Sequence, residues 1–196
     1  MNWDLTLEIA GFAIGVLYLW WEYHANARMW LVGIIMPAIS MWIYFRKGLY
    51  ADFSMNIYYF IMAIYGYWAW TRRSHGSKAK EKPQLDIHHA APLTLLGCAG
   101  ATAILWAAIG YMLTFTNSTV VIYDAFTTAM SIVATWMLAR KIIEQWWCWV
   151  LVDAVCVGLY IYKGIYFYAT LYAIYTVIAF FGYFKWRRMM LADAQQ

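Results

Sequence analysis

Seven long runs of apolar residues divide the chain, and short polar segments separate them. The runs lie at residues 5–23, 29–45, 53–70, 92–115, 120–139, 145–162 and 165–184. An α-helix crosses the roughly 30 Å hydrocarbon core of a bilayer with about 20 apolar residues, because each residue advances about 1.5 Å. A spanning β-barrel needs strict apolar/polar alternation, which the runs lack. The pattern therefore predicts an all-α membrane protein with seven transmembrane helices.

The second half of the chain repeats the first half. A shift of 116 positions, without a gap, places residues 30–73 over residues 146–189. The identical pairs include Trp30/Trp146, Tyr44/Tyr160, Lys47/Lys163, Gly48/Gly164, Tyr59/Tyr175, Gly66/Gly182 and Trp70/Trp186. Internal repeats in an apolar chain are typical of transporters, which hold their substrate where the repeats meet.

The repeat predicts the organisation of the chain. We expect a first three-helix repeat over residues 1–73, a cytoplasmic linker over 74–91, a central connecting helix over 92–119, a second three-helix repeat over 120–189 and a tail over 190–196. Because one helix separates the two units, both enter the membrane in the same orientation. This is a 3+1+3 arrangement of parallel repeats. The linker is polar and basic, and we expect a mobile cytosolic loop.

The charges orient the predicted helices. Only 12% of the residues are charged and 65% are hydrophobic, so a soluble globular chain is excluded. Loops on one side collect Arg28, Arg72, Arg73, Lys78, Lys80, Lys82, Arg140, Lys141, Lys185, Arg187 and Arg188, and the other side has Arg46, Lys47 and Lys163. The positive-inside rule makes the first side cytoplasmic, with the N-terminus outside and the C-terminus in the cytoplasm. The net charge of +4 is explained by this topology, and we expect no nucleic-acid partner.

Asp153 is the most informative polar residue of the predicted spans. It lies near the midpoint of the sixth span, where an acid costs about 2.5–3.5 kcal/mol on insertion scales. Trp149 and Trp146 lie on the same helix face, one and two turns away. Aromatic faces beside a carboxylate suit a flat cationic ligand. The alternatives are a protonated structural Asp153 and an interfacial anchor role for Trp146.

Two equivalent stripes could supply the rest of a site. On the seventh span, Tyr172 and Tyr175 share one face, and their partners on the third span are Asn56 and Tyr59. Asn56 could instead hydrogen-bond a neighbouring helix. Glu8 and Asp124, which are also equivalent, are interpreted as structural. The three cysteines, Cys98, Cys148 and Cys156, all fall within spans and are expected to pack between helices without disulfides.

The chain resembles a known family of membrane proteins. The resemblance is carried by Leu49–Tyr58, Ile64–Arg72, Ser131–Ala134, Ala139–Trp149 and Lys163–Tyr166, and it extends over nearly the whole chain. These segments resemble the Pnu family of bacterial vitamin transporters, whose members carry nicotinamide riboside, thiamine or riboflavin. The spacing of Trp146 and Trp149 is similar to the family's substrate-stacking motif.

The resemblance implies several properties. It implies facilitated diffusion through the bacterial inner membrane, with the vitamin trapped inside the cell by a cytosolic vitamin kinase. It also implies a homotrimer and a fold similar to that of SWEET-type sugar transporters, although with another helix order. In the riboside carriers, amides occupy the positions that match Asp153 and Phe181, and glutamine the position that matches Asn56. The carboxylate and aromatic residues found here suit thiamine, which stacks against rings such as Phe181 and carries a permanent positive charge.

Other functions are weighed against this one. A nicotinamide riboside or riboflavin carrier of the same family remains an alternative, as does a vitamin-binding subunit of an ATP-driven importer, although such subunits are usually six-helical and lack the duplication. A retinal photoreceptor needs a lysine in the middle of the last span, which the sequence does not have. We expect no enzyme, no catalytic residues, no cofactor and no metal site, since His88 and His89 have no further ligands nearby in sequence.

Overall fold

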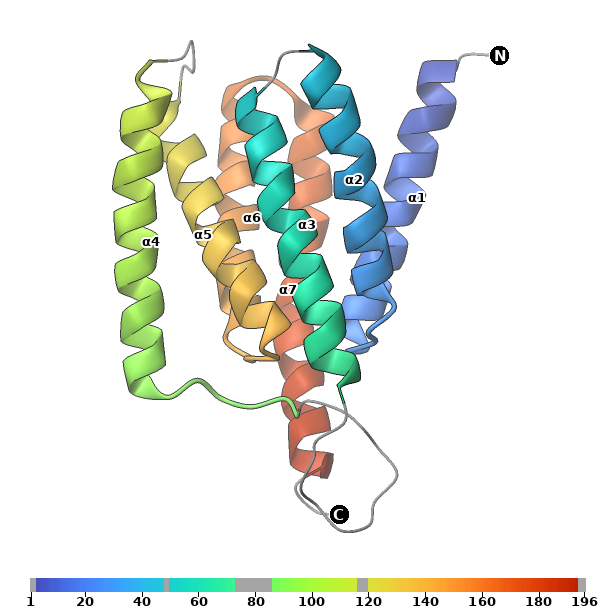
Figure 1. Cartoon of the computed structure of the whole chain (residues 1–196), viewed down its shortest axis with the longest axis vertical. Coiled ribbons are helices and arrows are strands. Elements are labelled where there is room, and N and C mark those ends of the chain that lie inside the picture. Colours follow the sequence, from blue (N-terminus) through green and yellow to red (C-terminus); the bar gives the residue numbers. More distant parts are fainter. Residues whose placement is uncertain (1–2, 48–49, 73–85, 116–119, 194–196) are drawn as a thin grey trace. The chain divides into compact units, whose positions relative to one another are not determined.

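The computed structural model of the chain describes residues 3–47, 50–72, 86–115 and 120–193. These residues form seven helices (Figure 1), which are α1 (Trp3–Tyr23), α2 (Met29–Lys47), α3 (Tyr50–Thr71), α4 (Pro92–Leu113), α5 (Val121–Ala139), α6 (Gln145–Tyr162) and α7 (Tyr166–Asp193). The described part of the chain contains no β-strand, only one isolated bridge between His88 and Ile142. The predicted all-α class and the seven helices are confirmed.

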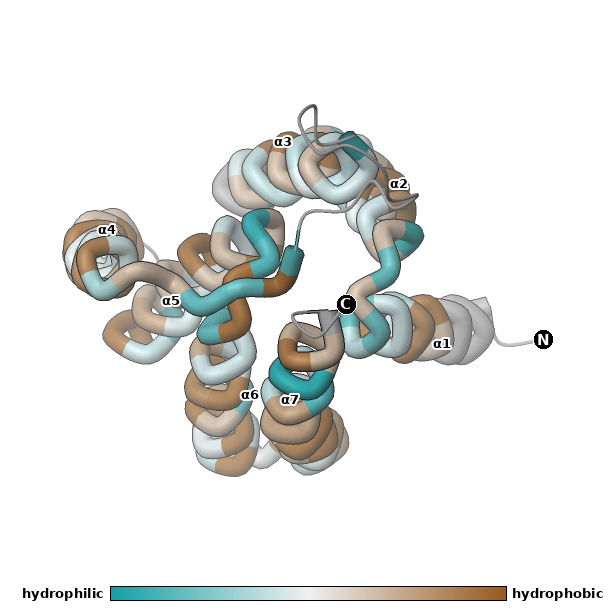
Figure 2. Tube along the Cα trace, turned by 90° about the horizontal axis from the view of Figure 1, so that it is seen from below, coloured by the Kyte–Doolittle hydropathy of each residue, from teal (hydrophilic) through white to brown (hydrophobic). Residues whose placement is uncertain are grey.

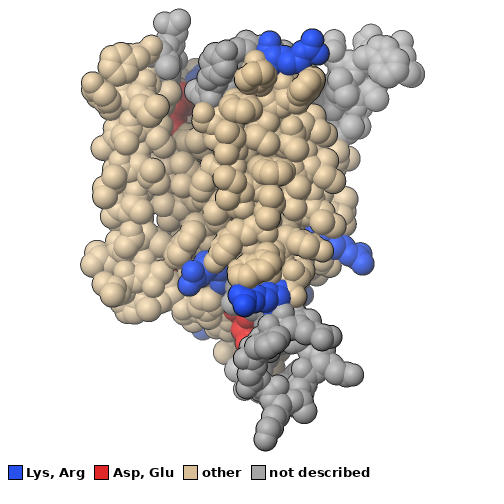
Figure 3. Space-filling model, in the orientation of Figure 1, with Lys and Arg blue, Asp and Glu red and all other residues tan. Residues whose placement is uncertain are grey.

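Five of these helices are long and apolar enough to cross a membrane. They are α2, α4, α5, α6 and α7. Helix α1, with 21 residues, and helix α3, with 22 residues, are also long enough to cross a membrane. On the face in view in Figure 3, Lys and Arg side chains lie near the ends of the helices and leave uncharged surface between them. In Figure 2 the hydrophilic positions of α7 gather toward its C-terminal end.

The chain divides into two compact units, Met1–Asp86 and Ile87–Gln196. In the first unit α2 packs along α3, and α1 packs against α2. In the second unit α6 packs along α7, α5 packs against α6, and α4 packs against α5. The contact of α6 with α7 repeats that of α2 with α3.

One aromatic contact is built twice, once in each unit. Trp30 of α2 meets Trp70 of α3 edge to face, with ring centroids 5.6 Å apart, and Trp146 of α6 meets Trp186 of α7 with the same separation. All four rings are buried. In each pair the first tryptophan, Trp30 or Trp146, also lies against a glycine of the facing helix. A Cβ added to Gly182 would lie 2.6 Å from the Trp146 ring, and one added to Gly66 would clash with Trp30.

The connections before these helix pairs also match, although their sequences do not. Ala25 and Lys141, which correspond in the repeat, are the two non-glycine residues with positive φ among the described residues, at 49° and 54°. The next amide returns to the preceding helix in both cases, from Asn26 to Trp21 at 2.8 Å and from Ile142 to Met137 at 3.0 Å. The duplication therefore extends to the α1–α2 and α5–α6 turns, beyond the window in which the sequences align well.

A small core joins α4, α5 and α6 in the second unit. Val133, Met137 and Ile142 are buried at its centre, and Cys98 and Cys148 pack around them. The Cys148 thiol lies 3.9 Å from the Met137 sulfur, and all three cysteines are free. The predicted packing role of Cys98 and Cys148 is confirmed.

Two boundaries differ from those expected. Helix α7 runs to Asp193, whereas the sequence predicted the last span to end at 184 and a tail to begin at 190. The basic residues that mark the end of a span are good helix formers, so the helix continues past the apolar run. The end of the linker is also ordered, because His88 exchanges two backbone hydrogen bonds with the α5–α6 turn, through Lys141 and Ile143. Residues 73–85 of the linker lie outside the described part.

A side-chain clasp holds the linker end in place. Glu144, just before α6, accepts a hydrogen bond from the Ala90 amide at 3.0 Å and contacts the His89 ring nitrogen at 2.7 Å. At the opposite end of α6, Lys163 lies 4.0 Å from Asp124 of α5. That contact agrees with the structural role predicted for Asp124, while the side chain of Glu8 lies outside those described.

Candidate functional site

Asp153 lies in the middle of α6 and is almost completely buried, with 7% of its surface exposed. Among the described residues, no hydrogen bond or ion pair satisfies its carboxylate. The phenol groups of Tyr172 and Tyr175 on α7 lie near enough to interact with it electrostatically. The structure therefore brings together three of the predicted site residues, and it buries an acid whose charge has no partner in its own unit.

Trp149 lies one turn before Asp153 on the same helix face. Its indole N–H is buried and has no hydrogen-bond partner among the described residues. Because a buried indole N–H normally finds an acceptor, this group is available to a ligand or to water. Trp149 and Asp153 together present a ring face, a donor and an anion along one stripe of α6.

A stack of tyrosines follows toward the C-terminal end of α6. Tyr160 lies between Tyr168 and Tyr172 of α7, with both ring-centroid distances at 5.3 Å and interplanar angles of 24° and 17°. Tyr172 also meets Tyr175 edge to face at 5.9 Å. This aromatic wall lies beside Asp153, and such walls bind flat cations through their ring faces.

Trp146 is placed differently from Trp149. It is 1% exposed, lies against Gly182 and meets Trp186 edge to face. Its symmetric counterpart Trp30 makes the same contacts in the other unit. The ring of Trp146 is thus used in helix packing, and a ligand contact for this residue stays a prediction.

Phe181 is not brought to the tyrosine wall by the contacts of its own unit. It is 56% exposed and meets Phe180 edge to face at 5.7 Å. Six helical residues separate it from Tyr175, which turns it about 120° away from that face. Its predicted ligand contact is likewise untested.

Asn56 and Tyr59 belong to the first unit, on α3. Both are half-buried. Tyr59 meets Tyr58 at 5.5 Å and lies close to Tyr18 of α1. A contribution of these two residues to a shared site stays a prediction.

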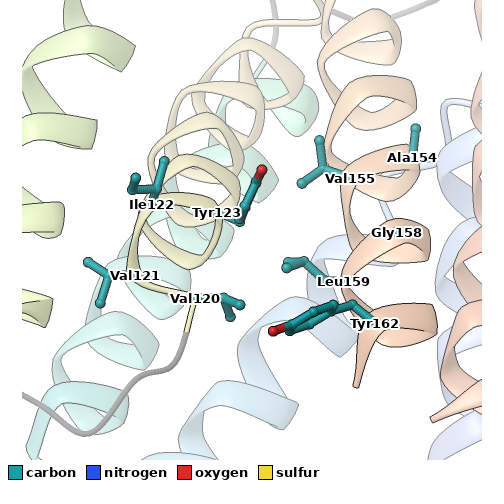
Figure 4. Close-up of a pocket in the computed structure, with 9 residues that line it drawn as sticks. All are labelled: Val120, Val121, Ile122, Tyr123, Ala154, Val155, Gly158, Leu159 and Tyr162. Atoms are coloured by element: carbon teal, nitrogen blue, oxygen red, sulfur yellow. The ribbon is translucent and has the colours of Figure 1, made fainter. Parts of the chain in front are cut away.

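An open groove of about 750 Å³ lies on another face of α6, between its C-terminal half and the start of α5 (Figure 4). Its lining is apolar and consists of Val120, Val121, Ile122, Tyr123, Ala154, Val155, Gly158, Leu159 and Tyr162. None of the predicted site residues lines it. The groove suits hydrocarbon and offers nothing to hold a charged ligand.

One buried polar side chain was missed by the sequence analysis. Gln145, the first residue of α6, is fully buried, and both its amide oxygen and its amide nitrogen lack a hydrogen-bond partner among the described residues. Its spacing of four residues from Trp149 is the signal that could have identified it, because that spacing places the two on one helix face. No group of three His, Cys, Asp or Glu residues that could hold a metal occurs in the described part of the chain.

This arrangement can bind but offers no covalent chemistry. Burying an ion without a counter-charge is costly, so the site favours a ligand that brings its own positive charge. The rings of Trp149 and the tyrosines favour a flat ligand. The chemistry therefore fits reversible binding of a planar organic cation.

The sequence model described as "Nicotinamide mononucleotide transporter" matches residues 5–188 of the chain. The nicotinamide riboside transporters PnuC of Escherichia coli K12 and of Shigella flexneri are each 24% identical over 207 residues, covering 94% of this chain and 87% of theirs. A crystal structure of the vitamin B3 transporter PnuC aligns with a TM-score of 0.66 and 18% identity, over 91% of this chain and 79% of the other. That likeness supports the fold.

Proposed function

Because the chain belongs to the nicotinamide mononucleotide transporter family, we propose that it takes up thiamine by facilitated diffusion. At the coarser level it is a membrane transporter of vitamins, a multi-pass protein of the bacterial inner membrane, and not an enzyme. The finer proposal concerns which vitamin the site accepts and how the vitamin crosses.

The observation that carries the thiamine proposal is the buried carboxylate of Asp153, which has no hydrogen bond or ion pair among the described residues and lies one turn from Trp149. Thiamine has a thiazolium ring with a permanent positive charge and an aminopyrimidine ring with an amino donor. The carboxylate can pair with the cation or accept a hydrogen bond from the amino group. The ring faces of Trp149, Tyr172 and Tyr175 can stack against both heterocycles.

Nicotinamide riboside is the second candidate, and the names of the two relatives favour it. It is also a flat cation, so Asp153 would attract it as well. Its carboxamide and ribose need several neutral hydrogen-bonding partners. The family resemblance implies that the riboside carriers have an amide side chain at the position that matches Asp153. The carboxylate found at this position favours thiamine.

We also propose how transport proceeds. The two three-helix repeats rock about a site near the bilayer midplane and expose it to either side in turn, with the N-terminus outside. A cytosolic kinase then phosphorylates the vitamin, and the charged product does not return. Assembly as a homotrimer belongs to the same proposal, because the family resemblance implies it.

Uptake into liposomes tests the proposal. Purified protein alone is reconstituted, and entry of labelled thiamine is followed without any ion gradient and with no ATP. We expect entry up to the outside concentration, competition by unlabelled thiamine, and much weaker competition by nicotinamide riboside.

Other outcomes contradict separate parts of the proposal. Entry of nicotinamide riboside but not of thiamine would establish the second candidate. Dependence on a proton or sodium gradient would exclude facilitated diffusion. Binding without entry would favour the capture subunit of an ATP-driven importer.

A further inference from the structure

Gln145 carries the strongest unexplained feature of the second unit. It is 0% exposed, and neither its amide oxygen nor its amide nitrogen is hydrogen-bonded within the described residues. Buried amide groups are almost always hydrogen-bonded, because leaving them unpaired costs free energy. The amide of Gln145 thus lacks a partner among the described residues, and a bound ligand can supply one.

Packing alone does not require an amide at this position. The counterpart of Gln145 in the first repeat is Met29, which is also 0% exposed and also begins a helix. Methionine has a similar length and volume but no polar atoms in need of strong hydrogen bonds. The equivalent place in the fold is thus filled by an apolar side chain when no polar group is required.

Gln145 belongs to the same stripe as the candidate site. Residues 145, 149 and 153 are spaced by four, which places Gln145, Trp149 and Asp153 along one side of α6. Two turns of helix separate the first from the last, about 12 Å along the axis. The indole of Trp149 lies between them, and its N–H has no hydrogen-bond partner in the described part of the chain. The stripe thus has an anion at one end, a ring with a free donor in the middle and a neutral amide at the other end.

A flat ligand with a polar end can satisfy all three groups. Its cationic part would pair with Asp153 and its ring would stack against Trp149. Its far end would then reach Gln145. A primary hydroxyl suits this amide, because it can donate to the amide oxygen and accept from the amide nitrogen.

We propose that Gln145 is a specificity-determining residue that binds the terminal hydroxyl group of the transported vitamin. The proposal rests on the proposed uptake of a flat cationic vitamin by this site, and it applies to thiamine and to nicotinamide riboside, which both end in a primary hydroxyl. A phosphate ester at that end carries a charge of about −1.5 to −2 at pH 7 and has few donors. It would leave the amide oxygen unpaired and bury its charge beside a neutral group. Gln145 therefore selects the unphosphorylated vitamin.

Calorimetric titration of purified full-length protein tests this role. The ligands are thiamine and a thiamine analogue with ethyl in place of hydroxyethyl, and the proteins are the wild type and Gln145→Met, which installs the side chain of the first repeat. Wild type should bind the hydroxyl-free analogue about tenfold more weakly than thiamine, as expected for the loss of one to two hydrogen bonds. Gln145→Met should bind thiamine about tenfold more weakly and no longer distinguish the two ligands.

Controls separate this role from folding and from the choice of vitamin. The thermal midpoint of ligand-free Gln145→Met should be unchanged or higher, and Gln145→Leu serves as a second apolar variant if Met packs poorly. If wild type binds nicotinamide riboside instead of thiamine, the thiamine assignment fails, and the same comparison is made with the riboside and its 5′-deoxy analogue. Equal discrimination by wild type and Gln145→Met, no discrimination by wild type, or no binding of either vitamin overturns the role of Gln145.

Discussion

Asp153 and Pro37 occupy equivalent positions in the two repeats, at the middle of α6 and of α2. Neither residue belongs to the packing pattern that the repeats share, since that pattern is made by Trp, Gly and Ala. The two repeats therefore share the contacts that hold each helix pair together, but they differ at the positions near the middle of the helix. A single asymmetric ligand can be recognised at those differing positions.

The stacking role of Trp149 gives a prediction for one residue. Trp149→Leu keeps an apolar side chain of moderate size but removes the ring face, so the affinity for thiamine should fall about tenfold, equivalent to roughly 1–2 kcal/mol. Trp147→Leu is the matched control, because Trp147 is exposed and its ring packs on Phe180 and Tyr183. Isothermal titration of both variants with thiamine measures the affinities. An equal loss of affinity in the two variants would assign Trp149 a packing role.

At the level of elements, the contact of Trp146 with Gly182 holds α6 against α7. Gly182→Ala places a methyl group 2.6 Å from the indole of Trp146, a buried ring that Trp186 also contacts edge to face, so the packing must shift. We expect a loss of about 1–3 kcal/mol in the free energy of unfolding, as for other overpacked interiors. The thermal midpoint of the purified protein measures it.

Gly158→Ala is the control for that variant, because an added Cβ at Gly158 meets no atom within 4 Å. This change should leave the midpoint unchanged or raise it slightly, since alanine favours helix more than glycine does. A similar loss in both variants would show that the close Trp146–Gly182 contact is not what matters.

The clasp at Glu144 links the start of α6 to the segment before α4. Glu144→Ala removes the acceptor of the Ala90 amide and the partner of His89, and it should lower the free energy of unfolding by about 1–2 kcal/mol. His89→Ala removes only the more exposed partner and should cost less than about 1 kcal/mol. Thermal unfolding compares the two, and a larger loss for His89→Ala would contradict the assignment of the main effect to the half-buried hydrogen bond from Ala90.

The elements were largely predictable from hydropathy and from the repeat, and their ends were less so. The apolar runs predicted seven helices, but they did not predict that α7 continues to Asp193. Hydropathy identifies the residues that lie within the membrane, and a helix can continue beyond them. The turn at Lys141 adopts the same left-handed backbone as Ala25 with a different side chain, so no sequence match revealed it.

The site was predictable where chemistry is unusual and not where it is ordinary. An acid in an apolar span identified Asp153. The shared tryptophan motif suggested Trp146 as well, and only the structure shows its ring enclosed by Gly182 and Trp186. Gln145 was overlooked because it follows a polar turn and its burial depends on tertiary contacts.

For the whole molecule, the charge distribution predicts which side each loop faces. In a variant that lacks the three native cysteines, Ile165→Cys and Ala192→Cys place single thiols at the two ends of α7, and both positions are exposed. A membrane-impermeant maleimide added to intact cells should label the thiol at 165 at once and the thiol at 192 only after permeabilisation. Labelling in the reverse order would invert the proposed topology.

The central claim is that the buried carboxylate of Asp153 binds the positive charge of the vitamin, and calorimetric titration of Asp153→Asn with thiamine tests it most directly. The amide keeps the shape of the side chain and removes its charge, so the affinity should fall about 10- to 100-fold, as expected for a charge-assisted hydrogen bond of roughly 1.5–3 kcal/mol. Asp124→Asn, which removes an acid that lies beside Lys163, should bind as the wild type does. Unchanged thiamine affinity in Asp153→Asn would contradict the account.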